Sequence, residues 1–451
     1  MVYPIKTLTA IQIADATGGR LIYGSGDTPV SSVSTDSRTL EKGTLYIPIK
    51  GEKFDGHDFL CDVCKHGVAG YLCSDGQINE GSLFAIMVDD TRAALLSLAS
   101  YYRSLFDIPV VGLTGSVGKT TTKEFIASVL SKGFETLATK GNFNNDIGVP
   151  LTLFGLNDNT QAAVIEMGMS NFGEIEVLSK CARPDIAVIT NIGTSHIEFL
   201  GSREGILRAK SEIFEGLASG GRVILNGDDP YLWSLKGTLE FETVYVGIEN
   251  HECDLVAEAV KSDEHGSLFK CDDREYRISP VGIHNIYNAL AAIAAGTMLG
   301  LSYERIYAGL KAYKPDGIRQ NIVSVKGYKV INDCYNSSPQ SVKAALGVLD
   351  TVSANRRIAV LGSIGELGDK SEELHRQVGS YVTSSGADIL VTVGDDAKYI
   401  AEEAKGKEVH VFDDNQKAAR FLKSVVTDGD AVLVKASRFM KFETIADSLI
   451  D

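Results

Sequence analysis

A short stretch around residue 115 carries the residue types that suit a bound phosphate. Two glycines stand just before Lys119 and Thr120, with an apolar run ahead of them and a helical pattern behind. Glycines let backbone N–H groups close on phosphate oxygens, and the N-terminus of the following helix adds positive potential. Lys119 is then expected to reach the terminal phosphates and the Thr120 hydroxyl to bind Mg²⁺. The predicted nucleotide-binding loop consists of Gly115, Ser116, Val117, Gly118, Lys119, Thr120 and Thr121.

The spacing of this loop differs from its widespread form, in which four residues separate the first glycine from the Gly-Lys pair. Leu113 occupies that first position here, and the nearest glycines are Gly112 and Gly115. A tight turn that binds nothing is the alternative, but Gly-Lys-Thr-Thr between a strand and a helix has little structural purpose otherwise. Nucleotide binding is therefore the favoured interpretation, with the reaction left open.

Two further polar residues follow apolar runs that indicate buried strands. Glu166 comes directly after 162–165, and His196 closes the segment that follows 185–189. In open parallel sheets ligands bind beyond the carboxyl ends of the strands, so both side chains are expected near the glycine loop. Glu166 is a candidate Mg²⁺ ligand, since this ion takes oxygen donors; a helix-capping or salt-bridged glutamate is the alternative. A lone histidine such as His196 is more often structural.

Lys210 lies on a helical stretch that follows the His196 segment. A surface lysine is the simplest interpretation. A buried lysine with a lowered pKa is neutral, however, and a neutral amine can add CO₂ to give a carbamate. That reaction turns a cation into a carboxylate-like metal ligand. Periodicity alone does not establish it.

Composition bounds the class of protein. The 451 residues are too many for one core, so two or three domains are expected. The net charge of −15 argues against non-specific binding of nucleic acid. We expect no membrane insertion, because no apolar run is long enough, and no secretory signal, because the N-terminus lacks its features. Seven scattered cysteines fit a reducing compartment, so a cytoplasmic location is expected.

A group of sulfur and imidazole side chains raises the question of zinc. Cys61, Cys64, His66 and Cys73 lie within one short stretch. We expect them on an apolar helix face and the strand after it, because free cysteine packs as a small hydrophobic residue. No zinc site is expected.

The order of apolar runs predicts an α/β protein of three domains. Residues 1–95 are expected to form a small α/β domain, with strands at 45–49, 69–73 and 83–88. Asp90 and Thr91 would begin a helix, and residues 96–107 would link it to the next domain. Residues 108–312 alternate strands and helices, which predicts a mostly parallel, mononucleotide-binding sheet. Residues 313–451 predict a Rossmann-like domain, with strands at 358–362, 389–394, 409–412 and 431–434.

Two polar turns in the first domain offer groups for a phosphorylated ligand. Asp36, Ser37 and Arg38 place an acid and a base beside a hydroxyl, and Lys53 and His57 flank Phe54 in a second loop. Each turn alone is more often a solvated loop than a site.

The chain resembles the Mur ligase family of ATP-dependent amide-bond ligases, which act in peptidoglycan precursor synthesis. The family's loop, Gly-x-Thr-Gly-x-x-Gly-Lys-Thr-Thr, accounts for the spacing at 112–121. Further stretches of resemblance are 141–153, 166–169, 190–214, 284–292, 332–339, 361–379 and 434–438. The runs at 54–57, 333–336 and 366–368 favour the dipeptide-adding member, whose substrates are UDP-N-acetylmuramoyl-tripeptide and D-alanyl-D-alanine.

The resemblance implies roles for residues from all three domains. ATP and two Mg²⁺ ions would be held by Lys119, Thr120, Glu166 and His196, and Lys210 would be the carbamylated lysine beside the second ion. Asn285, Asn288, Arg319 and Asp333 would position the nucleotide, the last two when the third domain closes on ATP. The UDP-substrate would meet Ser37, Arg38, Lys53, Phe54, His57 and Asn145. D-alanyl-D-alanine would meet Tyr335, Asn336, Lys435 and Arg438. A monomer is expected.

Three positions in the third domain depart from the family pattern. Ser363 stands where aspartate is usual, Gly365 where an apolar residue is usual, and Ala436 where glycine is usual.

The alternatives in the same chemical class are a relative that adds a single amino acid and a ligase similar to folylpolyglutamate synthetase. A nucleotide switch or ATPase that makes no amide bond is the alternative from a different class.

Overall fold

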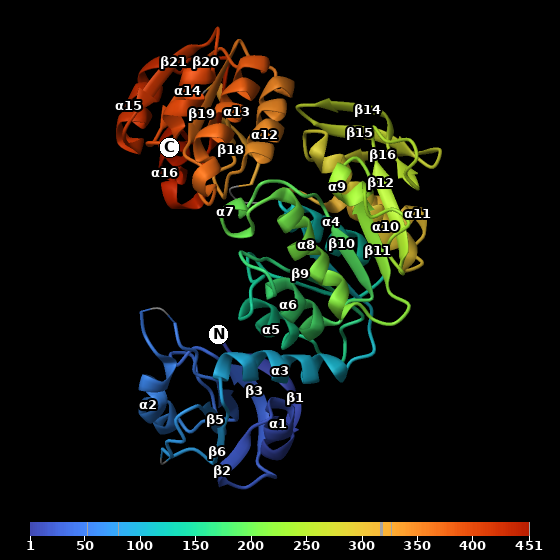
Figure 1. Cartoon of the computed structure of the whole chain (residues 1–451), viewed down its shortest axis with the longest axis vertical. Helices are drawn as coiled ribbons and strands as arrows, with labels where there is room; N and C mark the ends of the chain where they lie inside the picture. The colour runs from blue at the N-terminus through green and yellow to red at the C-terminus, as the bar shows by residue number, and fades with distance from the viewer. Residues whose placement is uncertain (52, 80, 316–318, 326, 451) are drawn as a thin grey trace.

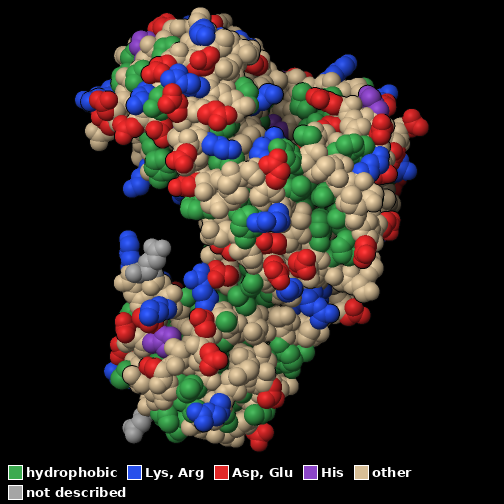
Figure 2. All heavy atoms as spheres, viewed as in Figure 1, with side chains coloured by type: hydrophobic (Ala, Val, Ile, Leu, Met, Phe, Trp, Pro, Cys, Tyr) green, Lys and Arg blue, Asp and Glu red, His purple; other side chains and the backbone are tan. Residues whose placement is uncertain are grey.

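The structure, a computed structural model, describes residues 1–51, 53–79, 81–315, 319–325 and 327–450. Three α/β domains follow one another along the long axis of the molecule (Figure 1). Figure 2 shows that one side is hollowed between the N-terminal domain and the two domains beyond it. None of the helices within these ranges is long and apolar enough to cross a membrane.

The N-terminal domain is built on a mixed six-stranded sheet with the order β1-β3-β4-β5-β6-β2. The predicted strands are present but shorter than expected: β4 (Thr44–Tyr46), β5 (Gly70–Cys73) and β6 (Phe84–Met87). The helix expected around Cys61 and Cys64 is α2 (Leu60–Lys65). The other elements were not predicted from the sequence: β1 (Tyr3–Thr9), α1 (Ala10–Thr17), β2 (Arg20–Gly24), β3 (Pro29–Ser34) and a 3₁₀ turn η1 (Gly56–Phe59).

The central domain has a parallel seven-stranded sheet in the order β13-β12-β11-β10-β7-β9-β8. The mostly parallel sheet predicted from the sequence is thus confirmed. The strands are β7 (Val110–Thr114), β8 (Thr136–Ala138), β9 (Ala162–Glu166), β10 (Ile186–Ile189), β11 (Arg222–Asn226), β12 (Glu242–Gly247) and β13 (Leu255–Val256). A small antiparallel sheet, which was not predicted, is formed by β14 (Glu258–Asp263), β15 (Gly266–Cys271) and β16 (Arg274–Ile278).

Alternating residues of β7 serve two separate cores. Val111 and Leu113 pack with one hydrophobic cluster, together with α4 and α10, whereas Val110 packs with another. Helices on both faces explain why the strands read as unbroken apolar runs. The helices are α4 (Lys119–Leu130), α5 (Gly148–Leu153), α6 (Glu174–Ala182), α7 (Ile197–Leu200), α8 (Arg203–Ser211), η2 (Glu212–Gly216), α9 (Pro230–Trp233), α10 (His284–Met298) and α11 (Tyr303–Ala312).

The C-terminal domain has a six-stranded sheet in the order β17-β18-β22-β19-β20-β21. Its four predicted strands are confirmed and parallel, and an antiparallel pair at one edge was not predicted. The strands are β17 (Asn321–Val325), β18 (Tyr328–Asn332), β19 (Arg356–Gly362), β20 (Ile389–Val393), β21 (Glu408–Phe412) and β22 (Asp430–Lys435). The helices are α12 (Pro339–Thr351), η3 (Gly368–Lys370), α13 (Ser371–Ser384), α14 (Ala397–Glu403), α15 (Asn415–Val425), η4 (Arg438–Met440) and α16 (Glu443–Ile450).

Helix α3 (Thr91–Ser104) joins the first two domains. The Asp90 side chain caps it, as predicted, by accepting from the N–H groups of Arg92 and Ala93 at 2.7 and 2.8 Å. The Tyr102 hydroxyl donates to the Leu156 carbonyl at 2.9 Å, and the Lys6 N–H donates to the same hydroxyl at 3.0 Å. The helix is therefore shared between two cores.

The cysteines near residue 61 do not all lie where the sequence suggested. Cys64 and Cys73 are buried as predicted, but Cys61 is exposed, so it does not belong to the apolar face of α2. In the part of the chain that the structure describes, there is no cluster of three or more His, Cys, Asp or Glu side chains that could hold a metal.

Candidate active site

The glycine loop is a tight connection between β7 and α4. A Cβ atom on Gly115 would lie 1.9 Å from Oγ1 of Thr190, so only glycine fits there. Gly118 has a φ of 83°, a left-handed conformation that glycine adopts without strain. Asn191, after β10, holds the loop: its carbonyl accepts from Ser116 N–H at 3.1 Å and its Oδ1 from Val117 N–H at 2.9 Å. The first i→i−4 bond of α4 is Thr122 N–H to Gly118, so the preceding amides point free of the helix.

Gly115→Ala is expected to weaken nucleotide binding, because the new methyl group would push Thr190 or the loop aside. We expect a loss of at least about tenfold in affinity, which corresponds to about 1.4 kcal/mol. Calorimetric titration with ADP and thermal unfolding would measure this. Gly347→Ala is the control: this helical glycine has no heavy atom within 4 Å of the added methyl. It should bind ADP normally and unfold at the same or a higher temperature, since alanine favours a helix by about 1 kcal/mol. Equal behaviour of the two variants would contradict the prediction.

Glu166 ends β9 beside the start of α4. Its Oε1 accepts from Thr120 Oγ1 at 3.3 Å and from Asn144 Nδ2 at 2.8 Å. Its Oε2 is buried and has no hydrogen-bond partner among the described residues. A buried carboxylate oxygen without a partner is costly, and a divalent cation with oxygen ligands is the group that would satisfy it. Thr120 and Glu166 therefore fit Mg²⁺.

Lys119 is the first residue of α4. Its Nζ donates to the carbonyl of Gly115 at 2.7 Å, so the side chain folds over the loop. Burial lowers the pKa of Lys119, and the nearby Glu166 partly opposes this shift. Both groups lie at the mouth of the loop, where a phosphate chain would place its negative charge.

His196 comes directly before α7 and has a φ of 63°. Its Nδ1 lies 2.7 Å from Oε2 of Glu366 in the third domain, close enough for an ion pair, although the angle is not that of a hydrogen bond. The neighbouring His196 lowers the pKa of Glu366. The ring therefore lies between the two domains.

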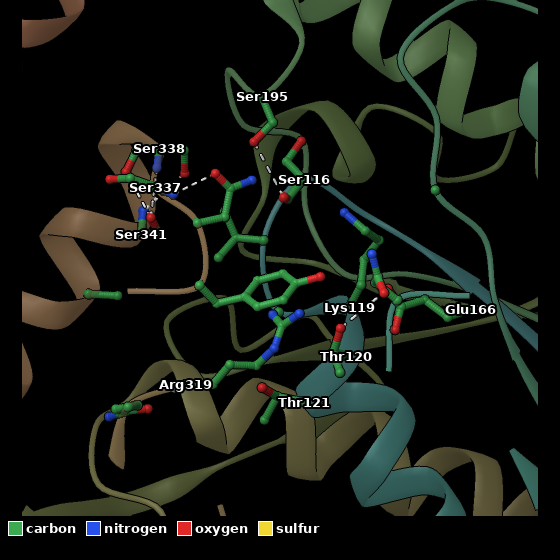
Figure 3. Close-up of a pocket in the computed structure, with 18 of the residues that line it drawn as sticks. Ser116, Lys119, Thr120, Thr121, Glu166, Ser195, Arg319, Ser337, Ser338 and Ser341 are labelled. Carbon is green, nitrogen blue, oxygen red and sulfur yellow. Dashed lines mark hydrogen bonds between the residues drawn. The ribbon is translucent and has the colours of Figure 1, made fainter. Parts of the chain in front are cut away.

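One cavity of about 390 Å³ joins these groups to others from the third domain (Figure 3). In the figure, Lys119, Thr120 and Glu166 lie opposite Ser337, Ser338 and Ser341, and Arg319 reaches in between them. The predicted residues that line it are Ser116, Val117, Gly118, Lys119, Thr120, Thr121, Asn145, Glu166, His196, Asn285, Asn288, Arg319, Asp333, Tyr335, Asn336 and Lys435.

The N-terminal turn of α10 lies behind the glycine loop. Asn288 Oδ1 accepts from Thr122 Oγ1 at 2.9 Å, and its Nδ2 donates to Asn285 Oδ1 at 3.1 Å. Asn285 Nδ2 in turn donates to Oε1 of Gln320 at 2.9 Å. Burial lowers the pKa of His284, whose Nε2 is 3.0 Å from the same Gln320 oxygen. This network connects α4 to the third domain.

The third-domain side of the cavity is rich in cations. Lys435 is almost fully buried, and its Nζ donates to Asp333 Oδ2 at 2.7 Å and to the Asn336 carbonyl at 2.9 Å. The Arg319 guanidinium carbon lies 3.5 Å from the centre of the Tyr335 ring. Arg438 stands 5.7 Å from that ring but does not line the cavity. These groups suit an anionic ligand beside the phosphate site.

Lys210 lies in α8 and is 1% exposed. Burial, together with the charge of Lys119, lowers its pKa well below the ordinary value. No ion pair joins it to an acid within the described ranges. A lowered pKa favours the neutral amine, which is the form that can add CO₂.

The predicted UDP residues of the first domain do not line this cavity. The segment between β4 and α2, which carries three of them, borders the hollow in Figure 2. Arg38 is mostly exposed and pairs with Asp36 at 2.8 Å, which holds the pKa of that carboxyl well below its usual range. His57 Nδ1 lies 2.6 Å from Asp55 Oδ1, and its Nε2 lies 3.2 Å from Ser74 Oγ. Asn145 lines the cavity, and its Oδ1 accepts from Gly148 N–H at the start of α5 at 2.9 Å.

Several lining residues were not identified from the sequence. They include Asn142, Asn144, Gly168, Glu174, Ser195, His284, Gln320, Ser337, Ser338 and Ser341. Most of them lie in the stretches that resemble the family. Their closeness in sequence to the predicted site residues could therefore have indicated that they line the cavity. The unusual residues Ser363, Gly365 and Ala436 do not line the cavity; Ser363 Oγ accepts from Ala397 N–H at 3.3 Å, within the third domain.

A phosphate loop at the carboxyl end of a parallel sheet, facing basic residues of a second α/β domain, fits an enzyme that binds ATP between two domains. Family models match in three parts: "Mur ligase family, catalytic domain" at 29–103, "Mur ligase middle domain" at 113–296, and "Mur ligase, glutamate ligase domain" at 318–438. The UDP-N-acetylmuramoyl-tripeptide--D-alanyl-D-alanine ligase of Bacillus subtilis is 41% identical over 94% of both chains.

Solved structures of Mur ligases are also similar to this chain. A crystal structure of MurF from Acinetobacter baumannii matches with a TM-score of 0.92 at 33% identity, covering 99% of each chain. MurF ligase from Thermotoga maritima, in complex with ADP, matches with a TM-score of 0.84 at 28% identity, covering 92% of this chain and 96% of that one. The chain belongs to the Mur ligase family.

Proposed function

We propose that the protein joins D-alanyl-D-alanine to UDP-N-acetylmuramoyl-tripeptide at the expense of ATP, forming UDP-N-acetylmuramoyl-pentapeptide, ADP and phosphate. The observation that carries this proposal is a cavity in which a phosphate loop and a buried acid face basic residues of the third domain. The names of the relatives supply the substrates. We further propose the division into residues 1–95, 96–107, 108–312 and 313–451, with the first domain holding UDP.

The first step activates the acid end of the tripeptide. A free carboxylate is a poor acyl donor because oxide would have to leave, whereas an acyl phosphate has a stable leaving group. Transfer of the γ-phosphoryl group gathers negative charge, which fixed cations and backbone donors stabilise. Lys119 and the amides at the start of α4 are placed for this, and Arg319 would approach from the third domain.

Thr120, Glu166 and His196 would hold one Mg²⁺, and a carbamate on Lys210 would help to hold a second. Bound there, the ions would draw off charge from the phosphates. Lys210 would supply its ligand by adding CO₂ to the neutral amine, with loss of one proton. Its burial and its lack of an acidic partner in the described ranges support this reaction.

The second step is attack of the dipeptide amine on the acyl phosphate, through a tetrahedral intermediate from which phosphate leaves. Tyr335, Asn336, Lys435 and Arg438 are proposed to hold the dipeptide. Lys435 supports this assignment, because it presents a buried cation at the cavity wall. Exclusion of water protects the acyl phosphate from hydrolysis, so the third domain would close over it.

The proposed UDP site lies across the hollow. Ser37, Arg38, Lys53, Phe54 and His57 belong to the first domain, and Asn145 belongs to the central domain. Phe54 is 69% exposed and Arg38 is exposed, so both are accessible to a ligand. The Phe54–His57 run also argues against the folylpolyglutamate alternative.

Oxygen tracing tests the function. The tripeptide carboxylate is labelled with ¹⁸O and incubated with ATP, Mg²⁺, D-alanyl-D-alanine and the protein. We expect one labelled oxygen in the released phosphate, because the acid oxygen leaves with the phosphoryl group. Mass detection of the pentapeptide product, with single amino acids offered in parallel, separates the dipeptide ligase from its relatives.

Two outcomes would contradict the proposal. Unlabelled phosphate would exclude the acyl phosphate. Phosphate release that ignores both the UDP-tripeptide and D-alanyl-D-alanine would indicate a nucleotide switch or ATPase instead.

A further inference from the structure

Two residues with left-handed backbone meet where the third domain contacts the central one. His196 has a φ of 63° and Glu366 a φ of 61°. Besides the 2.7 Å contact between their side chains, the N–H of Glu198 donates to the Glu366 carbonyl at 3.3 Å. Left-handed conformations are costly for residues with side chains and persist where the surroundings hold them, often at functional sites. Their occurrence on both sides of one contact points to a functional arrangement.

The third domain holds Glu366 in place from behind. The N–H of Ile364 donates to Nε2 of His375 at 2.9 Å, and the N–H of Gly365 donates to Oγ of Ser437 at 3.0 Å. His375 is fully buried, and burial lowers its pKa. Its ring is therefore neutral, and Nε2 keeps the lone pair that accepts this bond. The core of the third domain thus sets the position of Glu366.

The segment that carries His196 is held by the same domain at a second point. Gln340 of α12 accepts from the Thr194 hydroxyl at 3.0 Å. Beside it, the N–H of Gly193 donates to Oγ of Ser116 in the glycine loop at 2.8 Å. Displacement of the third domain would therefore disturb both His196 and the phosphate loop.

We propose that Glu366 is a positioning residue, which reaches from the third domain to orient the His196 ring toward the nucleotide cavity. A carboxylate next to one ring nitrogen can hold the orientation of the ring and leave the other nitrogen free for a metal or phosphate. The inference rests on the proposed function of the cavity. It means that the metal site of the central domain is complete only with the third domain in contact.

The test compares Glu366→Gln with Glu198→Gln in the full chain. Glu198 is an exposed carboxylate at the same contact, and its side chain forms no ion pair within the described ranges. Calorimetry measures ADP binding with and without Mg²⁺, and steady-state assays measure kcat and KM for ATP. For Glu366→Gln we expect Mg²⁺-dependent binding and kcat to fall about 10–100-fold. Binding of metal-free ADP should be unchanged, and Glu198→Gln should match the parent protein.

Three outcomes would overturn the inference, and a fourth would separate it from the proposed function. Equal Mg²⁺ dependence in Glu366→Gln and the parent would overturn the inference, and so would equal loss of metal-free ADP binding, which indicates general damage. In a double variant with His196→Asn, the losses should not add, because Glu366 acts through His196; full addition would also overturn it. If Mg²⁺ binding depends on Glu366 while the parent makes no pentapeptide, the proposed function fails and the positioning role stands.

Discussion

Lys210→Ala is expected to lower ligation by about 10²–10³-fold, the usual effect of removing one group that stabilises transition-state charge. The lysine is buried and its pKa is strongly lowered, which favours the neutral amine that the proposed addition of CO₂ requires. Alanine leaves space that a small acid can enter. Formate or acetate in the millimolar range should therefore restore part of the activity, and removing CO₂ and bicarbonate should slow the parent protein.

Arg208→Ala is the matched control for this experiment. Arg208 lies on the same helix, is exposed, and stacks on Phe172 away from the cavity. Its variant should keep the parent rate and ignore added acids. Unchanged turnover in Lys210→Ala would remove the carbamate from the mechanism. Lys210→Ala could also lose activity that formate and acetate do not restore, while the parent protein does not depend on CO₂. That result would show that Lys210 has a structural role only.

Glu166→Gln is expected to lower kcat by about 10³-fold, because metal stabilisation of the transferring phosphoryl group contributes several kcal/mol. The substitution keeps the size and the oxygen that accepts from Asn144 and Thr120. It replaces the buried, unpartnered Oε2 by a neutral amide nitrogen. Burying an unpaired charge costs more than burying an unpaired amide, so thermal unfolding should occur at the same or a higher temperature.

In Glu166→Gln we thus expect a large fall in kcat without a fall in the unfolding temperature. This combination is expected for a metal ligand. The comparison variant is Glu176→Gln, on α6, where the carboxylate pairs with Lys180 near the surface. It should change neither quantity measurably, since exposed ion pairs contribute little. A large fall in the unfolding temperature of Glu166→Gln, with Mg²⁺ affinity unaltered, would show a structural role instead.

The parts of the fold that the sequence revealed are those with simple hydrophobic patterns. Strands β9 and β10 are covered on both faces, so they read as unbroken apolar runs. Strand β14 was not predicted, because most of its residues are exposed and no apolar alternation marks it. The edge strand β17, which is only partly buried, was not predicted either.

The candidate site, like the fold, could be predicted only in part from the sequence. The location of Glu166 and His196 near the glycine loop could be predicted, because parallel strands bring their carboxyl ends together. Two contacts could not be predicted from the sequence: Asn191 accepts a hydrogen bond from the glycine loop, and Glu366 lies next to His196. Each joins segments that meet only in the folded chain. Arg38 shows the opposite case: its partner Asp36 is local.

The sharing of α3 between two cores limits how the chain can be divided. A shortened protein beginning at residue 108 would lose Tyr102 and, with it, the bond to the Leu156 carbonyl. It would also lose Arg103, which donates to the carbonyls of Ala182 and Phe106 at 3.1 and 2.6 Å. The surface of α5 and α6 that α3 covers would face water. We therefore expect the first two domains to fold best when they are expressed together, and exchange of domains between relatives to succeed more readily at the third domain than at the first.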